Sequence, residues 1–207
     1  MALSAYFAFL LLVAAERAAE LLLSRRNARL AFARGGVESA ADHFRWMTAL
    51  HALFLPACAV EAYLGAALRG HDWIVSSAAL RGHDWIVSPT LLSWPSLLFL
   101  VLALGAQGLR WWAIAALGWR WNVRVIVTPG EPPVRRGPYR FVRHPNYIAV
   151  IVEMLAVPLV HGAFLTALVF SLLNAWVLRI RIRDEERALG ASYAAAFAQV
   201  PRFIPHG

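Results

Sequence analysis

Long apolar runs separated by shorter polar segments dominate the sequence. A helix needs roughly 20 mostly apolar residues to cross a bilayer, so the pattern predicts about five transmembrane helices. The fourth run contains Pro158, and only His161-Gly162 separates it from the fifth, which predicts a tight helical hairpin. The runs lie at about 3–24, 46–67, 91–117, 147–161 and 163–182.

The polar segments differ in character. The segment 118–146 contains a short β-like run at 123–128 followed by several proline and glycine breakers, which predicts an ordered connection. The tail beyond 182 should begin as a helical extension of the fifth run and end in the non-helical sequence PRFIPHG. We expect one membrane domain over 1–207, with three transmembrane helices in 1–117 and a second region in 118–207.

Composition supports a membrane protein. Hydrophobic residues make up 60% of the chain, charged residues 15%, and the mean hydropathy is +0.56. A soluble domain carries roughly a quarter charged residues, so we predict an all-α integral membrane fold. The net charge is +8 and every cationic side chain is arginine. Because the arginines flank apolar runs, they favour membrane topology and anionic lipid contacts over nucleic-acid binding.

The distribution of arginine predicts an orientation. The segments after the first and third runs and the tail are rich in arginine, whereas the segment between the second and third runs holds only Arg69 and Arg81. The positive-inside rule therefore predicts the N-terminus outside and the C-terminus in the cytoplasm. The first run lacks a signal-peptide pattern and is interpreted as a retained span.

Two features argue against disulfide and metal sites. A single cysteine, Cys58, excludes an internal disulfide framework and a cysteine zinc site, and we expect it to be a small buried apolar side chain. The sequence AALRGHDWIVS occurs at 66–76 and again at 78–88, which indicates a recent duplication. Its His-Asp pairs were copied with their neighbours, and we expect no metal site there.

Polar side chains also occur inside the predicted spans. Ionisable groups at such positions usually face the protein interior. Counted from the predicted cytoplasmic ends, they share a depth of about 8–12 Å. They indicate either a polar substrate cavity open to the cytoplasm or structural pairing, such as Glu16 with Arg110. The residues are Glu16, His51, Arg110, Glu153 and Asn174.

The densest chemistry flanks the predicted hairpin. The stretch RRGPYRFVRHPNYIAV, 135–150, leads into it, and RIRIRDEERAL, 179–189, follows it. A tight hairpin brings its two ends together, so His144 and Tyr147 should lie near the acidic pair Glu185-Glu186.

These motifs resemble the isoprenylcysteine carboxyl methyltransferase family. The stretch GPYRFVRHPNY, a two-helix hairpin, an EE pair and a terminal P-R-F-I-P carry the resemblance, which is strongest over about 105–205. ERAAELLLSRRNARL and LRWWAIAALGWRWNVRVIV are similar to a bacterial branch associated with O-methylation of polyketide pyrones or resorcinols. The resemblance implies an integral membrane enzyme that uses S-adenosyl-L-methionine, with 118–207 as its catalytic region.

The resemblance also implies roles for individual residues. One arginine before the EE pair would be catalytic, with Arg181 the nearest match and Arg183 the rival. The chain departs from the family at Ala149, where glycine is usual. The cofactor-binding residues implied are Arg143, His144, Pro145, Tyr147, Glu185 and Glu186.

Several alternatives remain at this stage. The expected acceptor is a lipophilic acidic oxygen that enters from the bilayer, and a polyketide synthase is an expected neighbour. Prenylcysteine carboxylates and phospholipid amines are alternative acceptors, and a small transporter or scaffold is the non-enzyme alternative. A bacterial inner (plasma) membrane location follows from the branch that the chain resembles, and the distribution of arginine predicts an active site that faces the cytoplasm.

Overall fold

The computed structural model describes residues 2–39, 41–69 and 94–204. Most of the duplicated segment, including both His-Asp pairs, lies outside the described residues, so its interpretation stays a prediction. In the described part of the chain, helices predominate. They are α1 (Ala2–Ala33), α2 (Ala41–Arg69), α4 (Trp94–Leu117), α5 (Pro145–Leu159) and α6 (Phe164–Ala196), with short 3₁₀ helices η2 (Gly118–Arg120) and η3 (Gly137–Arg140).

Among the described residues, three helices are long and apolar enough to cross a membrane. These spans are Arg45–Leu68, Trp94–Arg120 and Phe164–Ala196, and α5 is a shorter apolar helix. Helix α1 is also long, but Glu16, Arg17 and Glu20 interrupt its apolar sequence. The chain is therefore an integral membrane protein by length and composition of its helices, while a full set of five spans stays a prediction.

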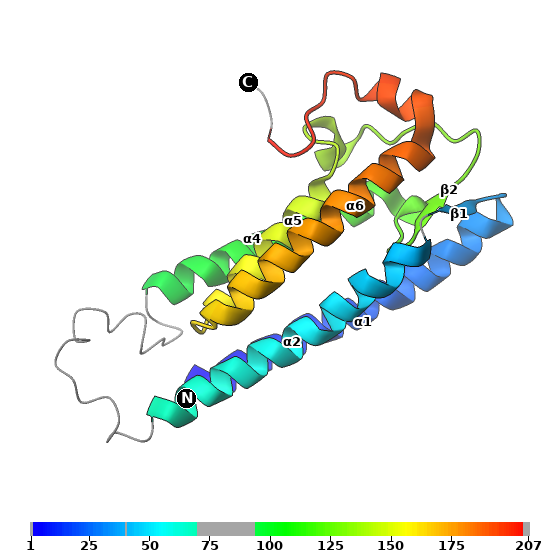
Figure 1. Ribbon diagram of the computed structural model, residues 1–207. Coiled ribbons are helices and arrows are strands. Elements are labelled where there is room, and N and C mark those ends of the chain that lie inside the picture. Colours follow the sequence, from blue (N-terminus) through cyan, green and yellow to red (C-terminus); the bar gives the residue numbers. More distant parts are fainter. Residues whose placement is uncertain (1, 40, 70–93, 205–207) are drawn as a thin grey trace.

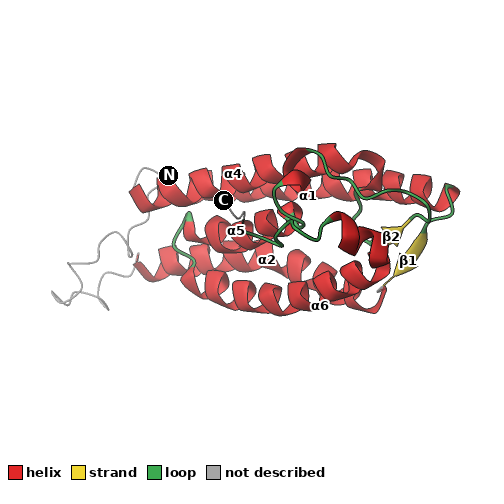
Figure 2. Cartoon of the chain, turned by 90° about the horizontal axis from the view of Figure 1, so that it is seen from above, coloured by secondary structure: helices red, strands yellow, loops and turns green. Residues whose placement is uncertain are grey.

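The helices form two layers (Figure 1). Helices α1 and α2 lie side by side in one layer, and α4, α5 and α6 form the other. Within the second layer α5 lies between α4 and α6 and packs against both, as Figure 2 also shows. Among the described helices, α4 and α5 pack together most extensively.

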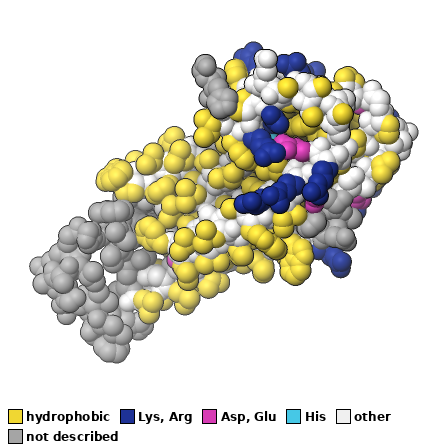
Figure 3. Space-filling model, turned by 45° about the horizontal axis from the view of Figure 1, so that its top comes forward, with side chains coloured by type: hydrophobic (Ala, Val, Ile, Leu, Met, Phe, Trp, Pro, Cys, Tyr) yellow, Lys and Arg dark blue, Asp and Glu magenta, His cyan; other side chains and the backbone are white. Residues whose placement is uncertain are grey.

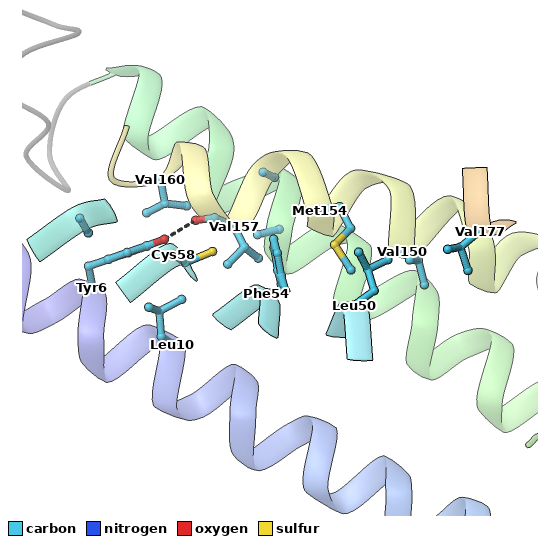
Figure 4. Close-up of a cluster of buried hydrophobic side chains, with 13 residues drawn as sticks. Tyr6, Leu10, Leu50, Phe54, Cys58, Val150, Met154, Val157, Val160 and Val177 are labelled. Atoms are coloured by element: carbon cyan, nitrogen blue, oxygen red, sulfur yellow. Dashed lines mark hydrogen bonds between the residues drawn. The ribbon is translucent and has the colours of Figure 1, made fainter. Parts of the chain in front are cut away.

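A cluster of buried apolar side chains joins the two layers (Figure 4). Phe54 from α2 and Met154 from α5 are 5% and 2% exposed. The Tyr6 hydroxyl donates a hydrogen bond to the carbonyl of Val157 over 3.1 Å, which ties α1 to α5. Cys58 is fully buried in this cluster, which confirms its prediction as a small apolar side chain.

A small antiparallel sheet accompanies the mostly helical fold. Strand β1 (Val37–Ser39) follows α1, and β2 (Val125–Val127) lies in the segment predicted to be β-like. Val37 is opposite Val127 and Ser39 is opposite Val125. The pairing fixes the long connection after α4 to the end of α1, and thereby holds one wall of the site described below.

Helices α5 and α6 are joined by residues 160–163, with Gly162 at φ 75°. The Glu61 carboxylate of α2 accepts hydrogen bonds from the backbone N–H groups of Leu165 and Thr166, at 2.9 and 2.7 Å. It therefore caps the first turn of α6, where such groups lack intrahelical partners. Helix α6 continues past 182 to Ala196, with a kink at Gly190, which confirms the predicted helical tail.

Candidate active site

The RHPNY motif forms the entry into α5. Pro145 is the first helical residue, where its fixed φ suits the helix and its missing N–H costs nothing. The two preceding residues bind the chain that follows α6: Arg143 N–H donates to Pro201 O over 2.9 Å and His144 N–H to Arg202 O over 3.2 Å. The motif is thus held by the helix on one side and by the C-terminal segment on the other.

The returning helix α6 brings the acidic pair to this motif. His144 Nε2 lies 3.1 Å from a Glu186 carboxylate oxygen. The Tyr147 hydroxyl donates a hydrogen bond to Glu185. The predicted convergence of the two hairpin ends is confirmed, with each aromatic side chain matched to one glutamate.

Arg181 and Arg183 have different surroundings. Arg181 Nε donates to the Tyr147 hydroxyl over 2.7 Å, and its Nη2 donates to the Val123 carbonyl over 2.6 Å. Arg183 is exposed and lies in a groove on another face of α6. Arg181, Tyr147 and Glu185 therefore form one hydrogen-bonded group, in which Arg183 takes no part.

Glu186 lies outside this hydrogen-bonded group and pairs with other side chains. Its carboxylate pairs with Arg202 Nη2 at 2.6 Å and faces Arg143 Nη1 at 3.8 Å. The hydrogen bond with Glu186 raises the pKa of Arg202 above its ordinary value. Because Glu186 joins His144 to Arg202, it holds the motif and the C-terminal segment together.

A cavity of about 330 Å³ lies against these residues. Glu185, Arg181, Arg143, His144 and Tyr147 line it, whereas Glu186 and Pro145 are not among its lining residues. The other walls come from the connection 119–134, from η3, and from the end of α6. The volume lies in the range of small-molecule sites.

Sequence reasoning missed several lining residues. Asn146, inside the RHPNY motif, lines the cavity, and its buried Oδ1 has no hydrogen-bond partner in the described part of the chain. Tyr139 and Tyr193 supply aromatic walls, and burial raises the pKa of the Tyr139 hydroxyl well above its ordinary value, so that it stays neutral. The motif itself could have indicated Asn146, because it separates two residues that were selected.

The polar side chains of the spans form a second group. Arg110 pairs with Glu153, and its Nε lies 3.6 Å from Glu20. Arg17 Nη2 lies 3.2 Å from Glu153 and donates to Gln107 over 2.7 Å. The structure thus places Glu153 and Arg110 together, as part of a buried ion cluster between α1, α4 and α5.

The remaining predicted cavity residues lie around this cluster or apart from it. Glu16 accepts from the Trp111 indole and lies 3.6 Å from Arg17, so the suggested pairing of Glu16 with Arg110 is wrong. His51 Nδ1 lies 2.8 Å from the Met47 carbonyl of its own helix. Asn174 lines the groove that contains Arg183.

Comparisons with known proteins agree with the geometry. The model of the isoprenylcysteine carboxyl methyltransferase (ICMT) family matches residues 97–191, which include α5, the EE pair and most of α4. The uncharacterized protein YpbQ of Bacillus subtilis is 32% identical over 174 residues, or 84% of this chain and 90% of that protein. An uncharacterized protein of Haemophilus influenzae is 31% identical over 91 residues, or 44% of this chain and 53% of that protein.

The matched segment and the convergent site coincide. The family model covers both the RHPNY motif and the EE pair, whose side chains meet at the cavity. The apolar helices provide the membrane setting that a membrane methyltransferase requires. The chain therefore belongs to the isoprenylcysteine carboxyl methyltransferase family and is a membrane methyltransferase.

Proposed function

We propose that the chain uses S-adenosyl-L-methionine to methylate an acidic oxygen of a lipophilic acceptor, of the polyketide pyrone or resorcinol type. The single observation that carries the proposal is the position of Arg181. Two hydrogen bonds fix its guanidinium at the cavity wall, beside Glu185, on the membrane-spanning helix α6. A cation fixed at this position can pair with an anionic oxygen of a molecule that is dissolved in the membrane.

The cavity residues fit the cofactor chemically. Glu185 supplies a carboxylate for an ammonium or a ribose diol, and Arg143 a cation for a carboxylate. The unpartnered Oδ1 of Asn146 can accept from an amino group. Tyr139 and Tyr193 offer aromatic surface for a flat ring. When bound, S-adenosyl-L-methionine supplies an electrophilic methyl group on a sulfonium centre.

The protein's tasks are then orientation and charge complementarity. Arg181 holds the acceptor as its anion, which needs no strong general base. The Tyr147 hydroxyl and the Val123 carbonyl fix the plane of the guanidinium, so that the remaining nitrogen, Nη1, keeps one direction. Holding the methyl donor and the acceptor in line removes much of the entropic cost of bringing them together.

The charge of the cavity bears on the alternatives. Four arginines and two glutamates line it: Arg120, Arg124, Arg143, Arg181, Glu131 and Glu185. An excess of arginine favours an acidic oxygen over a phospholipid amine, which would need an acidic lining. A prenylcysteine carboxylate has the same acidic chemistry and is the second candidate. A transporter would favour polar groups across the full membrane depth, whereas the hydrogen-bonded group of Arg181, Tyr147 and Glu185 lies at the first turn of α5.

The location and neighbours belong to the same proposal. We place the protein in the bacterial inner membrane, with the N-terminus outside and the cavity facing the cytoplasm. Figure 3 shows arginine side chains gathered at one end and apolar side chains over the rest of the visible body, which supports this orientation by the positive-inside rule. A polyketide synthase would supply the acceptor.

Calorimetry with S-adenosylhomocysteine tests the cofactor site. We expect the detergent-purified wild type to bind, and Glu185→Gln and Asn146→Leu each to bind about tenfold more weakly, since one polar contact contributes on the order of 1.4 kcal/mol. Arg187→Gln is the matched control, because its side chain is 79% exposed on the same helix. A wild type that does not bind would exclude the assignment.

Product analysis tests the acceptor. The wild type would receive a radiolabelled methyl donor with an alkylresorcinol, an alkylpyrone, a farnesylcysteine derivative or phosphatidylethanolamine. We expect label in the phenolic or enolic lipid, and a fall of about 10²–10³-fold in kcat for Arg181→Gln. Label only in farnesylcysteine or in the amine would replace the proposed acceptor.

A further inference from the structure

A second groove lies on another face of α6. It has a volume of about 440 Å³, and Ile151 of α5 and Phe203 of the C-terminal segment contribute to its walls. The cavity described above is lined on α6 by Arg181, Glu185, Leu189, Ser192 and Tyr193, whereas the groove takes other positions of the helix. Those positions are Ser171, Asn174, Ala175, Leu178, Arg179, Ile182 and Arg183.

The mouth of the groove is cationic. Arg179, Arg183 and Arg202 line it, and the lining includes no carboxylate. Two nearby acids pair with other arginines: Asp184 lies 3.7 Å from Arg187, and Glu186 lies 2.6 Å from Arg202, which is itself a groove residue. In the part of the chain that the structure describes, no carboxylate therefore neutralises Arg179 or Arg183.

Polar atoms also lie deeper in the groove. Asn174 is 2% exposed, and its Oδ1 has no hydrogen-bond partner among the described residues. The Ser171 hydroxyl, one turn further from the arginines, is likewise buried and unpartnered within them. An unsatisfied buried polar group costs about 1–3 kcal/mol, so these atoms indicate a ligand that supplies partners.

The apolar path continues below them. Ile151 and Leu155 on α5, and Leu168 on α6, are 43%, 47% and 60% exposed. Leu155 is four residues from Ile151 and Leu168 is three residues from Ser171, so each lies about one turn further from the arginines on its helix. The order along α6 is thus cationic, then polar, then apolar, over positions 183 to 168.

We propose that this groove binds an anionic glycerophospholipid. Arg179 and Arg183 hold the phosphate, Asn174 and Ser171 donate hydrogen bonds to the ester carbonyls one layer deeper, and the acyl chains follow α5 and α6. The Asn174 amide can donate after a 180° turn about its last side-chain torsion, because its oxygen and nitrogen exchange places. The inference goes beyond the proposed function, since α6 separates the groove from the methyl-transfer cavity, and it assigns Arg183 to lipid binding.

Native mass spectrometry tests the proposal without any methyl donor. The full chain, delipidated in detergent, would be titrated with palmitoyl-oleoyl phosphatidylglycerol, with the phosphatidylcholine of the same chains, and with inorganic phosphate. We expect one tight phosphatidylglycerol adduct, and about 30-fold weaker binding in the Arg179→Gln/Arg183→Gln variant, from the usual contribution of a basic residue near an anionic lipid. Circular dichroism melting confirms that the variant is folded.

Matched control variants distinguish binding in the groove from non-specific attraction between the lipid and any arginine. Arg187→Gln removes one arginine charge from the same helix, outside the groove, and should change binding less than about threefold. Asn174→Leu should weaken the adduct while leaving both arginines in place. Equal binding by the double variant, equal loss in Arg187→Gln, equal binding of phosphatidylcholine, or full competition by inorganic phosphate would each overturn the proposal.

Discussion

Replacing Arg110 by methionine tests the buried ion cluster most directly. The cluster contains three carboxylates, Glu16, Glu20 and Glu153, and two guanidinium groups, Arg17 and Arg110. Arg110→Met leaves all three carboxylates with one cation. Glu153→Met leaves two carboxylates with two cations. The two substitutions should therefore differ, although they break the same ion pair.

The expected magnitudes follow from burial. Arg110 is 4% exposed and Glu153 is 7% exposed, so neither charge regains water when its partner is lost. Breaking a buried pair typically costs about 3–5 kcal/mol, which we expect for Arg110→Met. For Glu153→Met we expect about 1–3 kcal/mol, the cost of a lost buried hydrogen bond, because the remaining charges balance. The double variant should cost less than the sum of the two.

Unfolding in mixed detergent micelles, followed by far-ultraviolet circular dichroism, measures these differences. Arg120→Met is the control, because the Arg120 side chain is 27% exposed and pairs with Glu131 at the surface. Such pairs contribute about 0–1 kcal/mol. A cost for Glu153→Met equal to or above that of Arg110→Met would refute the charge-balance reasoning.

Three further substitutions address other contacts. Glu61→Ala should lower the free energy of unfolding by about 1–2 kcal/mol, because it removes the cap of α6, and Glu61→Gln should recover part of the loss in the same denaturation assay. Gly137→Ala should lower the unfolding temperature more than Gly130→Ala. Both glycines have positive φ, so the backbone strain is similar. An added methyl at Gly137 would lie 2.8 Å from a side-chain carbon of α4, whereas a methyl at Gly130 would meet open space. Tyr147→Phe should destabilise the protein by about 1–3 kcal/mol through two lost hydrogen bonds, and should weaken calorimetric binding of S-adenosylhomocysteine; an unchanged unfolding temperature would contradict the role of the hydroxyl.

The convergence of the hairpin ends was predictable from the sequence. Two apolar helices with a connection of a few residues must run antiparallel, so the residues before α5 and after the apolar part of α6 meet. The hairpin therefore brings His144 to the returning part of α6, and the structure shows that its partner there is Glu186. Arg181 was predictable only through the family resemblance, because Arg179 and Arg183 have the same local composition.

The pairing of the ionisable side chains inside the predicted spans was less predictable. Residue counting gives depth along a helix but not the direction of a side chain. Glu16 and Glu20 are four residues apart and share a helix face, so sequence alone does not select the one near Arg110. The structure places Arg110 Nε 3.6 Å from Glu20, while Glu16 binds Trp111.

The walls of the cavity depended on tertiary contacts. Strand β1 has three residues, too few for a detectable alternation, yet its pairing with β2 sets the position of the connection that lines the cavity. Asn146 sits inside a recognised motif, but only the structure shows its Oδ1 without a partner in the described chain.

The backbone contacts between 143–144 and 201–202 also order events during synthesis. All the helices are made before Pro201 and Arg202 emerge, so the membrane part of the protein can assemble while the entry to α5 still lacks its backbone partners. The entry to α5, which carries the RHPNY motif, is then fixed in place after the helices have formed, by residues that follow α6. A nascent chain already in the bilayer would lack both of these backbone hydrogen bonds until residues 201 and 202 leave the ribosome.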